Sequence, residues 1–129
     1  MKKTGNKIKL LIWLMLLGIA LAVFLTCNHQ SEFTGNRIKN PDAYVLDAEK
    51  MNGTDQHTLD LQKGDVLQVS FQTVRGSMHM EIKAPDGTAI YSGNGKEATG
   101  FTVNIPQSGT YTIQVEARQA KGAIHIQLP

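Results

Sequence analysis

Two histidines, His79 and His125, could carry chemistry if the fold brought them together. Each falls at an outward position of an alternating segment, and Glu81 lies on the same face as His79. Zinc would need three or four such ligands at fixed geometry, and a hydrolase would need a nucleophile beside its base. No serine of the chain sits in a recognisable nucleophile turn. We therefore predict exposed histidines, no metal, no cofactor and no catalytic activity, and keep a small surface hydrolase as the enzyme-class alternative.

A glycine-rich segment, Ser92-Gly93-Asn94-Gly95-Lys96, resembles a phosphate loop in composition. A phosphate loop needs a helix amino terminus behind it, because the aligned N–H groups of that helix bind the phosphate. Residues 97–101 lead into an alternating segment instead. The sequence therefore predicts a hairpin or a loop here.

Amide and hydroxyl side chains fill many outward positions of the alternating segments. They are Gln62, Gln68, Ser70, Gln72, Thr102, Asn104, Thr112, Gln114 and Gln127. Such a face can hydrogen-bond sugars, although an ordinary solvated sheet has the same composition. Sugar sites usually add aromatic rings, and the aromatic residues Phe71, Phe101 and Tyr111 fall on the apolar side of the alternation. Tyr91 and Tyr44 are thus the expected ligand-binding platforms.

The elements that carry these residues are strands, because apolar residues recur with period two from Tyr44 onward. The alternating segments are 44–46, 58–62, 67–72, 78–83, 89–91, 101–105, 111–116 and 124–128. Between them lie the turn sequences Lys63-Gly64-Asp65, Arg75-Gly76-Ser77, Pro85-Asp86-Gly87, Gly93-Asn94-Gly95, Pro106-Gln107-Ser108-Gly109 and Lys121-Gly122. Residues 47–51 could form one helical turn at most. The pattern predicts an all-β domain, an antiparallel β-sandwich or jelly roll of about eight strands.

Three short motifs add a family resemblance. They are Gly64-Asp65-x-Leu67-x-Val69, Ile82-x-x-Pro85-Asp86-Gly87, and Ser108-Gly109-Thr110-Tyr111-Thr112-Ile113-x-Val115. Over about residues 59–128 the chain resembles the bacterial pre-peptidase C-terminal domain group. That resemblance implies a jelly-roll appendage of the kind that accompanies secreted hydrolases and surface proteins. Calcium-binding members have several acidic residues before the Pro-Asp-Gly turn, whereas this chain has Glu81 alone, so no metal site is implied.

The amino terminus predicts a membrane segment. Four lysines precede an uncharged apolar run, residues 10–25, which is close to the length that crosses a bilayer. Residues 1–27 are therefore a lipoprotein signal with Cys27 as the lipidated residue, an uncleaved membrane anchor, or a signal cleaved after Ala22. Residues 28–41 are expected to be a polar linker. Residues 42–129 are expected to form the domain, facing outside the membrane.

Charge and cysteine content narrow the function. From Asn28 onward the chain has nine Lys and Arg against eleven Asp and Glu, without a basic stripe, so nucleic acid is an unsuitable partner. Cys27 is the only cysteine, which excludes an internal disulfide. We predict a membrane-tethered, non-catalytic binding or structural module that engages envelope components or a partner protein. A carbohydrate-recognition domain is the alternative within the binding class.

Overall fold

The computed structural model describes residues 12, 15, 31–97 and 99–129. Ile12 and Met15 lie in helical conformation, and Cys27 and the rest of residues 1–30 fall outside the described part. Within the described residues, no helix combines the length and the apolar character that crossing a membrane requires. The predicted membrane segment and the lipidation of Cys27 therefore stay predictions. Residues 31–129 form one compact unit.

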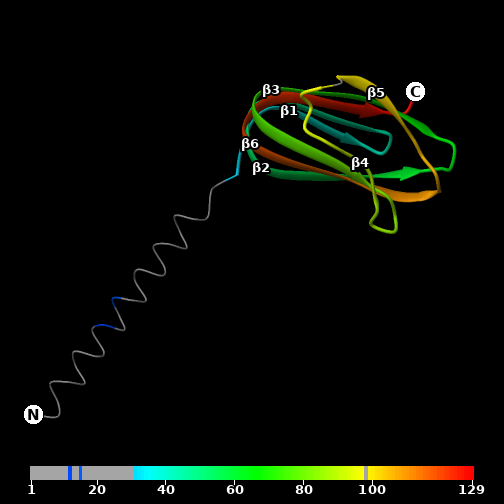
Figure 1. The fold of residues 1–129 in the computed structure, drawn as a ribbon, viewed down its shortest axis with the longest axis horizontal. Coiled ribbons are helices and arrows are strands. Elements are labelled where there is room, and N and C mark those ends of the chain that lie inside the picture. The colour runs from blue at the N-terminus through cyan, green and yellow to red at the C-terminus, as the bar shows by residue number, and fades with distance from the viewer. Residues whose placement is uncertain (1–11, 13–14, 16–30, 98) are drawn as a thin grey trace, which may run out of the picture. The chain divides into compact units, whose positions relative to one another are not determined.

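This unit is an antiparallel sheet of six strands (Figure 1). The strands are β1 (Glu32–Asn40), β2 (Ala43–Leu61), β3 (Val66–Lys83), β4 (Ala89–Gly93), β5 (Gly100–Asn104) and β6 (Gly109–Gln127). Their order is β1-β2-β6-β3-β4, and β5 also pairs with β3. The all-β antiparallel prediction is confirmed, but the count of about eight strands is wrong.

The count differs because β2, β3 and β6 bend and pass through both layers of the fold. Figure 1 shows these strands curving round at one end of the domain. The first layer contains β1, residues 43–48 of β2, 122–127 of β6 and 66–73 of β3, and β5. The second layer contains residues 53–61 of β2, 109–117 of β6 and 77–83 of β3, and β4. A single sheet thus folds over to make a two-layered sandwich.

Bulges and left-handed residues produce the bend. The pairing register shifts in β2 between Ala48 and Gly53 and in β3 between Thr73 and Ser77. Gly76 has a φ of 69° and Gln119 a φ of 44°, both in the left-handed region. A bulge adds one residue to a strand and bends it. The predicted turns Arg75-Gly76-Ser77 and Lys121-Gly122 are therefore wrong as chain reversals, because both sequences lie inside continuous strands.

The core is apolar and lies between the two layers. Its fully buried side chains include Tyr44, Leu46, Leu59, Phe71, Met78, Met80, Ile113 and Ile124. In each bent strand, the side chains that face the core switch between even and odd residue numbers at the bend. In β2 the even-numbered residues face the core before the bend and the odd-numbered ones after it, and in β3 and β6 the order is the reverse. One extra residue per strand reverses the alternation in this way, since side chains point to opposite faces with period two.

Two boundaries differ from the sequence-based prediction. The composition of residues 28–41 predicts a linker, but residues 32–40 form β1, which pairs with β2 from Asn40↔Ala43 to Glu32↔Asn52. Residues 47–51, which the sequence allowed one helical turn at most, lie inside β2. The apolar alternation did not predict β1, because nearly all the side chains of this strand are exposed and it has no such alternation. The compact unit therefore begins at Ser31 and not at Asp42.

Candidate binding face

The outward side of the first layer is a mainly polar surface across five strands. We call its outward side chains the amide-rich face. They are Asn36, Ile38 and Asn40 of β1, Val45 and Asp47 of β2, Gln68, Ser70 and Gln72 of β3, Thr102 and Asn104 of β5, and His125 and Gln127 of β6. Most of the amide and hydroxyl residues predicted to share a face therefore do so. Thr112 and Gln114 lie in the second layer instead.

Cross-strand pairing aligns these side chains in rows. One row runs from Asn40 through Ala43, Gln127 and Gln68 to Thr102, and crosses five strands. Gln127 and Gln68 are cross-strand partners in this row, and both side chains are exposed. Amide side chains donate and accept hydrogen bonds at once. The row therefore presents donors and acceptors to one extended ligand.

A hollow of about 430 Å³ lies at the end of this face next to the bend. Its lining residues are Thr34, Gly35, Asn36, Asp47, Ala48, Glu49, Gln72, Val74, Lys121, Gly122 and Ala123. Close approach of neighbouring backbones requires glycine at two of these lining positions. A Cβ on Gly35 would collide with the Asp47 carbonyl oxygen, and one on Gly122 would lie 2.5 Å from the Gln72 carbonyl oxygen. The hollow is thus built on closely spaced strands, and amide, carboxylate and ammonium groups surround it.

Charge on the amide-rich face is sparse and largely paired. The His125 Nε2 donates to Asp47 Oδ1 at 2.7 Å, and both side chains are about half exposed. The exposed apolar side chains Ile38 and Val74 lie beside the polar rows. A nearly neutral face with some apolar area suits a neutral ligand or a polar protein surface better than a polyanion.

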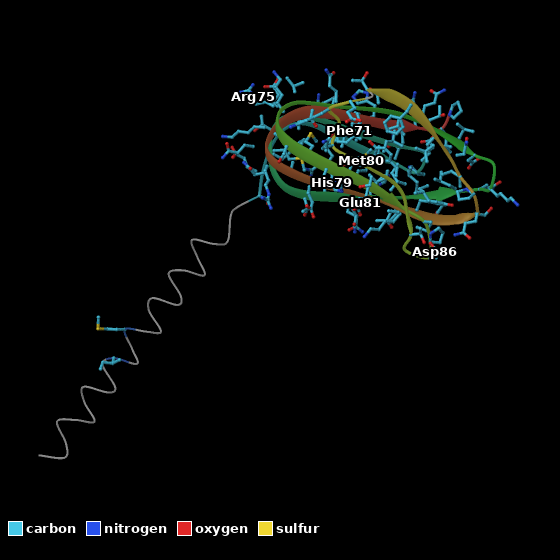
Figure 2. The ribbon with its side chains drawn as sticks, in the orientation of Figure 1. Phe71, Arg75, His79, Met80, Glu81 and Asp86 are labelled. Carbon is cyan, nitrogen blue, oxygen red and sulfur yellow. The ribbon has the colours of Figure 1, made fainter. Side chains whose placement is uncertain are left out.

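The outer side of the second layer is more highly charged. His79 Nε2 lies 3.2 Å from Glu81 Oε1 and 3.3 Å from Ser92 Oγ. Lys83 Nζ lies 3.8 Å from Glu81 Oε2. Figure 2 shows His79 and Glu81 together on β3, with Arg75 near the bend and Asp86 beyond the other end of the strand. The two sides of the sandwich therefore differ in chemistry.

His79 and His125 do not meet, although their strands are neighbours. In the β3–β6 pairing, His79 lies opposite Glu116 in the second layer and His125 opposite Ser70 in the first. Each histidine contacts a carboxylate of its own. Among the described residues, no group of three or more His, Cys, Asp or Glu side chains could hold a metal ion. The shared histidine site that the hydrolase alternative required is not formed.

Tyr44 is not an exposed platform, and that expectation is wrong. Its ring is fully buried, stacks on His57 with 5.6 Å between ring centroids, and its hydroxyl donates to Asp55 Oδ2 at 2.6 Å. Burial raises the pKa of the Tyr44 hydroxyl far above its ordinary value, and the hydrogen bond to Asp55 adds to the rise. The expectation came by elimination, because Phe71, Phe101 and Tyr111 fall on the apolar side of the alternation, but Tyr44 itself faces the core with Leu46 and Ala48.

Tyr91 is half-buried on β4 and packs against Phe101, with 4.7 Å between ring centroids. Burial also raises the pKa of its hydroxyl. It lies in the second layer, whereas Phe101 lies in the first, so the two rings close one edge of the sandwich. A ligand-binding role for Tyr91 stays a prediction.

Sequence reasoning missed a polar cluster around Asp55. Its Oδ1 accepts a hydrogen bond from Lys39 Nζ at 3.0 Å, and its Oδ2 lies 3.5 Å from Arg37 Nε as well as accepting from Tyr44. Burial alone would raise the pKa of Asp55, but the hydrogen bonds from Tyr44 and Lys39 and the two cationic charges together lower it. A break in the apolar alternation at residues 55 and 57 was the available signal.

No protein-family model and no curated protein matches the chain. Several solved structures do. PliG of Aeromonas hydrophila, a periplasmic lysozyme inhibitor of g-type lysozyme, aligns with a TM-score of 0.51 and 18% identity over 74% of this chain and 93% of that one. PliG of Salmonella Typhimurium (TM-score 0.40, 18% identity, 76% and 94% coverage) and a CBM4 protein (TM-score 0.41, 11% identity, 77% and 76% coverage) also align. At this identity the Aeromonas match shows a shared fold alone.

Proposed function

We propose that this protein is a non-catalytic extracytoplasmic binding module whose amide-rich face engages a protein or a glycan of the cell envelope. The observation that carries the proposal is the alignment of exposed amide and hydroxyl groups in rows across the strands of one layer. The backbone that carries these groups is held in paired strands, so a ligand that bonds to several of them has to order the side chains but not the backbone.

The amino-terminal sequence supports the extracytoplasmic position. The basic residues before the apolar run would stay in the cytoplasm, and the domain would then lie outside, held by an uncleaved anchor or by a lipidated Cys27. PliG, which shares the fold, is described as periplasmic. Fractionation after Cys27→Ala separates the two tethers. Loss of membrane retention indicates a lipoprotein, and unchanged retention indicates an anchor.

A protein partner is the first candidate. PliG is a lysozyme inhibitor, so a sandwich of this kind can serve protein recognition in the envelope. The exposed Ile38 and Val74 add apolar area beside the polar rows, and apolar and polar area together are typical of protein interfaces.

A glycan is the second candidate, and the Gln127–Gln68–Thr102 part of the row favours it. Neighbouring amides and a hydroxyl can accept from and donate to successive sugar hydroxyls along one direction. The hollow beside the bend would admit a sugar ring or a small peptide side chain. Tyr91 is the aromatic residue to test for stacking.

Affinity capture from membranes with the full chain, followed by a glycan array, tests the proposal. The informative variant is Gln68→Lys on the amide-rich face, and the matched control is Gln114→Lys on the second layer. A reproducible protein partner lost only with Gln68→Lys supports the first candidate. Saturable glycan binding lost with Gln68→Lys supports the second. If Gln68→Lys binds the protein partner or the glycan as well as Gln114→Lys does, the assignment of the binding face is contradicted.

A further inference from the structure

The end of the sandwich at which β2, β3 and β6 bend carries an excess of positive charge. We call this region the bend end, and it consists of residues 31–34, 49–52, 74–77 and 118–121. Its charged residues are four cations and two acids: Lys50, Arg75, Arg118, Lys121, Glu32 and Glu49. The remaining residues from Gly35 onward contain five cations and nine acids. Positive charge is therefore concentrated at the bend of a domain that is otherwise acidic.

Three of these cations have no acidic partner. Among the described residues, Arg75, Arg118 and Lys121 make no ion pair, whereas Lys50 Nζ lies 3.4 Å from Glu32 Oε1. Arg75 and Lys121 are cross-strand partners in the β3–β6 pairing, and Arg118 is the partner of Ser77. Like charges directly opposite each other destabilise a sheet. A bound anionic group would offset this repulsion.

The chain enters the domain at this same end (Figure 1). Ser31 lies next to Gly53, and Glu32 pairs with Asn52. Only residues 28–30 separate Cys27 from Ser31, and the four residue steps between them reach at most about 14 Å. A membrane tether that ends at Cys27 therefore keeps Ser31 within about 14 Å of the membrane surface, which is close to the Debye length of about 10 Å at 0.1 M salt.

We propose that the bend end docks on anionic phospholipid headgroups of the membrane that tethers the chain. The inference rests on the membrane tether of the proposed function. The guanidinium groups of Arg75 and Arg118 can each donate two parallel hydrogen bonds to phosphate oxygens, and Lys121 adds a third positive charge. Each Lys or Arg near an anionic surface strengthens membrane attachment about fivefold.

Docking gives the domain a defined orientation. Acidic residues occur at the opposite end, at or beside the turns between strands: Asp60, Asp65 and Asp86. Figure 2 shows Asp86 far from Arg75. An anionic membrane attracts the bend end and repels this acidic end. The row that contains Gln127, Gln68 and Thr102 lies away from the bend, so it stays accessible to a ligand.

Paramagnetic relaxation in nanodiscs tests the docking. The full chain, labelled with nitrogen-15, is reconstituted in discs of phosphatidylcholine, with phosphatidylglycerol either added or omitted, and a small share of the lipid carries gadolinium on its headgroup. Docking predicts that, in the anionic discs, the backbone amide signals of residues 74–77 and 118–121 lose intensity, while those of residues 62–65 and 84–88 do not. In the neutral discs only the tether acts, so the contrast between the two ends should be smaller.

Charge removal separates docking from tethering. A triple variant with Arg75→Gln, Arg118→Gln and Lys121→Gln should show, in anionic discs, the weaker contrast that wild type shows in neutral discs. The matched control removes three cations elsewhere, with Lys63→Gln, Lys83→Gln and Lys96→Gln. It has the same net charge as the triple variant and should keep the wild-type contrast. High salt should act like the triple variant, because it screens exposed charges.

Two results would overturn the proposal, and they identify different errors. If the chain stays in the discs but the contrast is the same with and without phosphatidylglycerol, docking is contradicted, and the tether and the amide-rich face are unaffected. If the chain leaves discs of both compositions, the tether is contradicted as well. Ligand binding by Gln68→Lys is measured separately, so a failure of the amide-rich face is distinguishable from both.

Discussion

Replacing Asp55 with alanine should destabilise the domain chiefly through Tyr44. The Tyr44 side chain is fully buried, and its hydroxyl loses the carboxylate of Asp55, to which it donates at 2.6 Å. A buried hydroxyl left without a partner costs about 1–3 kcal/mol. We therefore expect Asp55→Ala to lower the free energy of unfolding of residues 31–129 by about that amount. Urea denaturation followed by circular dichroism measures it.

The double-mutant cycle with Tyr44→Phe identifies the cause. In the Tyr44→Phe background no hydroxyl is left unpaired, so Asp55→Ala should cost less by about 1–2 kcal/mol, within the range of coupling energies for residues in contact. Gln114→Ala, on the exposed side of β6, is the control and should change stability by less than about 0.5 kcal/mol in both backgrounds. Additive effects of Asp55→Ala and Tyr44→Phe would refute the reasoning.

Four other outcomes follow from the fold. Ile113→Ala should cost about 2–5 kcal/mol, because Ile113 is fully buried, and an equal cost for Gln114→Ala would contradict the register. The pKa of Asp55 in the folded state is lowered from 3.8, so the ionised carboxylate contributes its full share to the free energy of unfolding above that value. This share is lost as the pH falls through the lowered pKa. The difference in stability between wild type and Asp55→Ala, measured from pH 6 to pH 2, should therefore shrink toward the acid end. Gly76→Ala should cost more than Gly64→Ala in urea titrations. Both glycines have positive φ, but only a Cβ at position 76 meets carbonyl oxygens, those of Gln119 and Arg118. Far-ultraviolet circular dichroism of residues 31–129 should show mainly strand, and a helix-dominated spectrum would contradict the fold.

The sequence contains the strands of this fold but conceals their continuity. Inward residues such as Phe71 and Met80 were identified correctly, since each side of the bend keeps its own alternation. The bulges reverse that alternation, and Gly76 and Gly122 look like turn residues. Three bent strands therefore look like six short ones. A phase change between two apolar segments, without a clear chain reversal, is the signature of such a bend.

The polar features were harder to predict because they depend on tertiary contacts. The amide-rich face follows from alternation, but which amides share a layer depends on strand order. β1 has no apolar pattern, because an edge strand held by Arg37 and Lys39 needs none. Tyr44 was misplaced because it was selected by elimination among the aromatic residues, whereas in the fold it faces the core beside Leu46.

Side-chain amide resonances test most directly whether the amide-rich face binds the envelope partner. The full chain, isotopically labelled, is titrated with the protein or glycan that the capture and array experiments identify. Binding through this face predicts that the NH₂ signals of Gln68, Gln72 and Gln127 shift, while those of Gln56 and Gln114 on the second layer do not. Shifts confined to Gln56 and Gln114 would contradict the assignment.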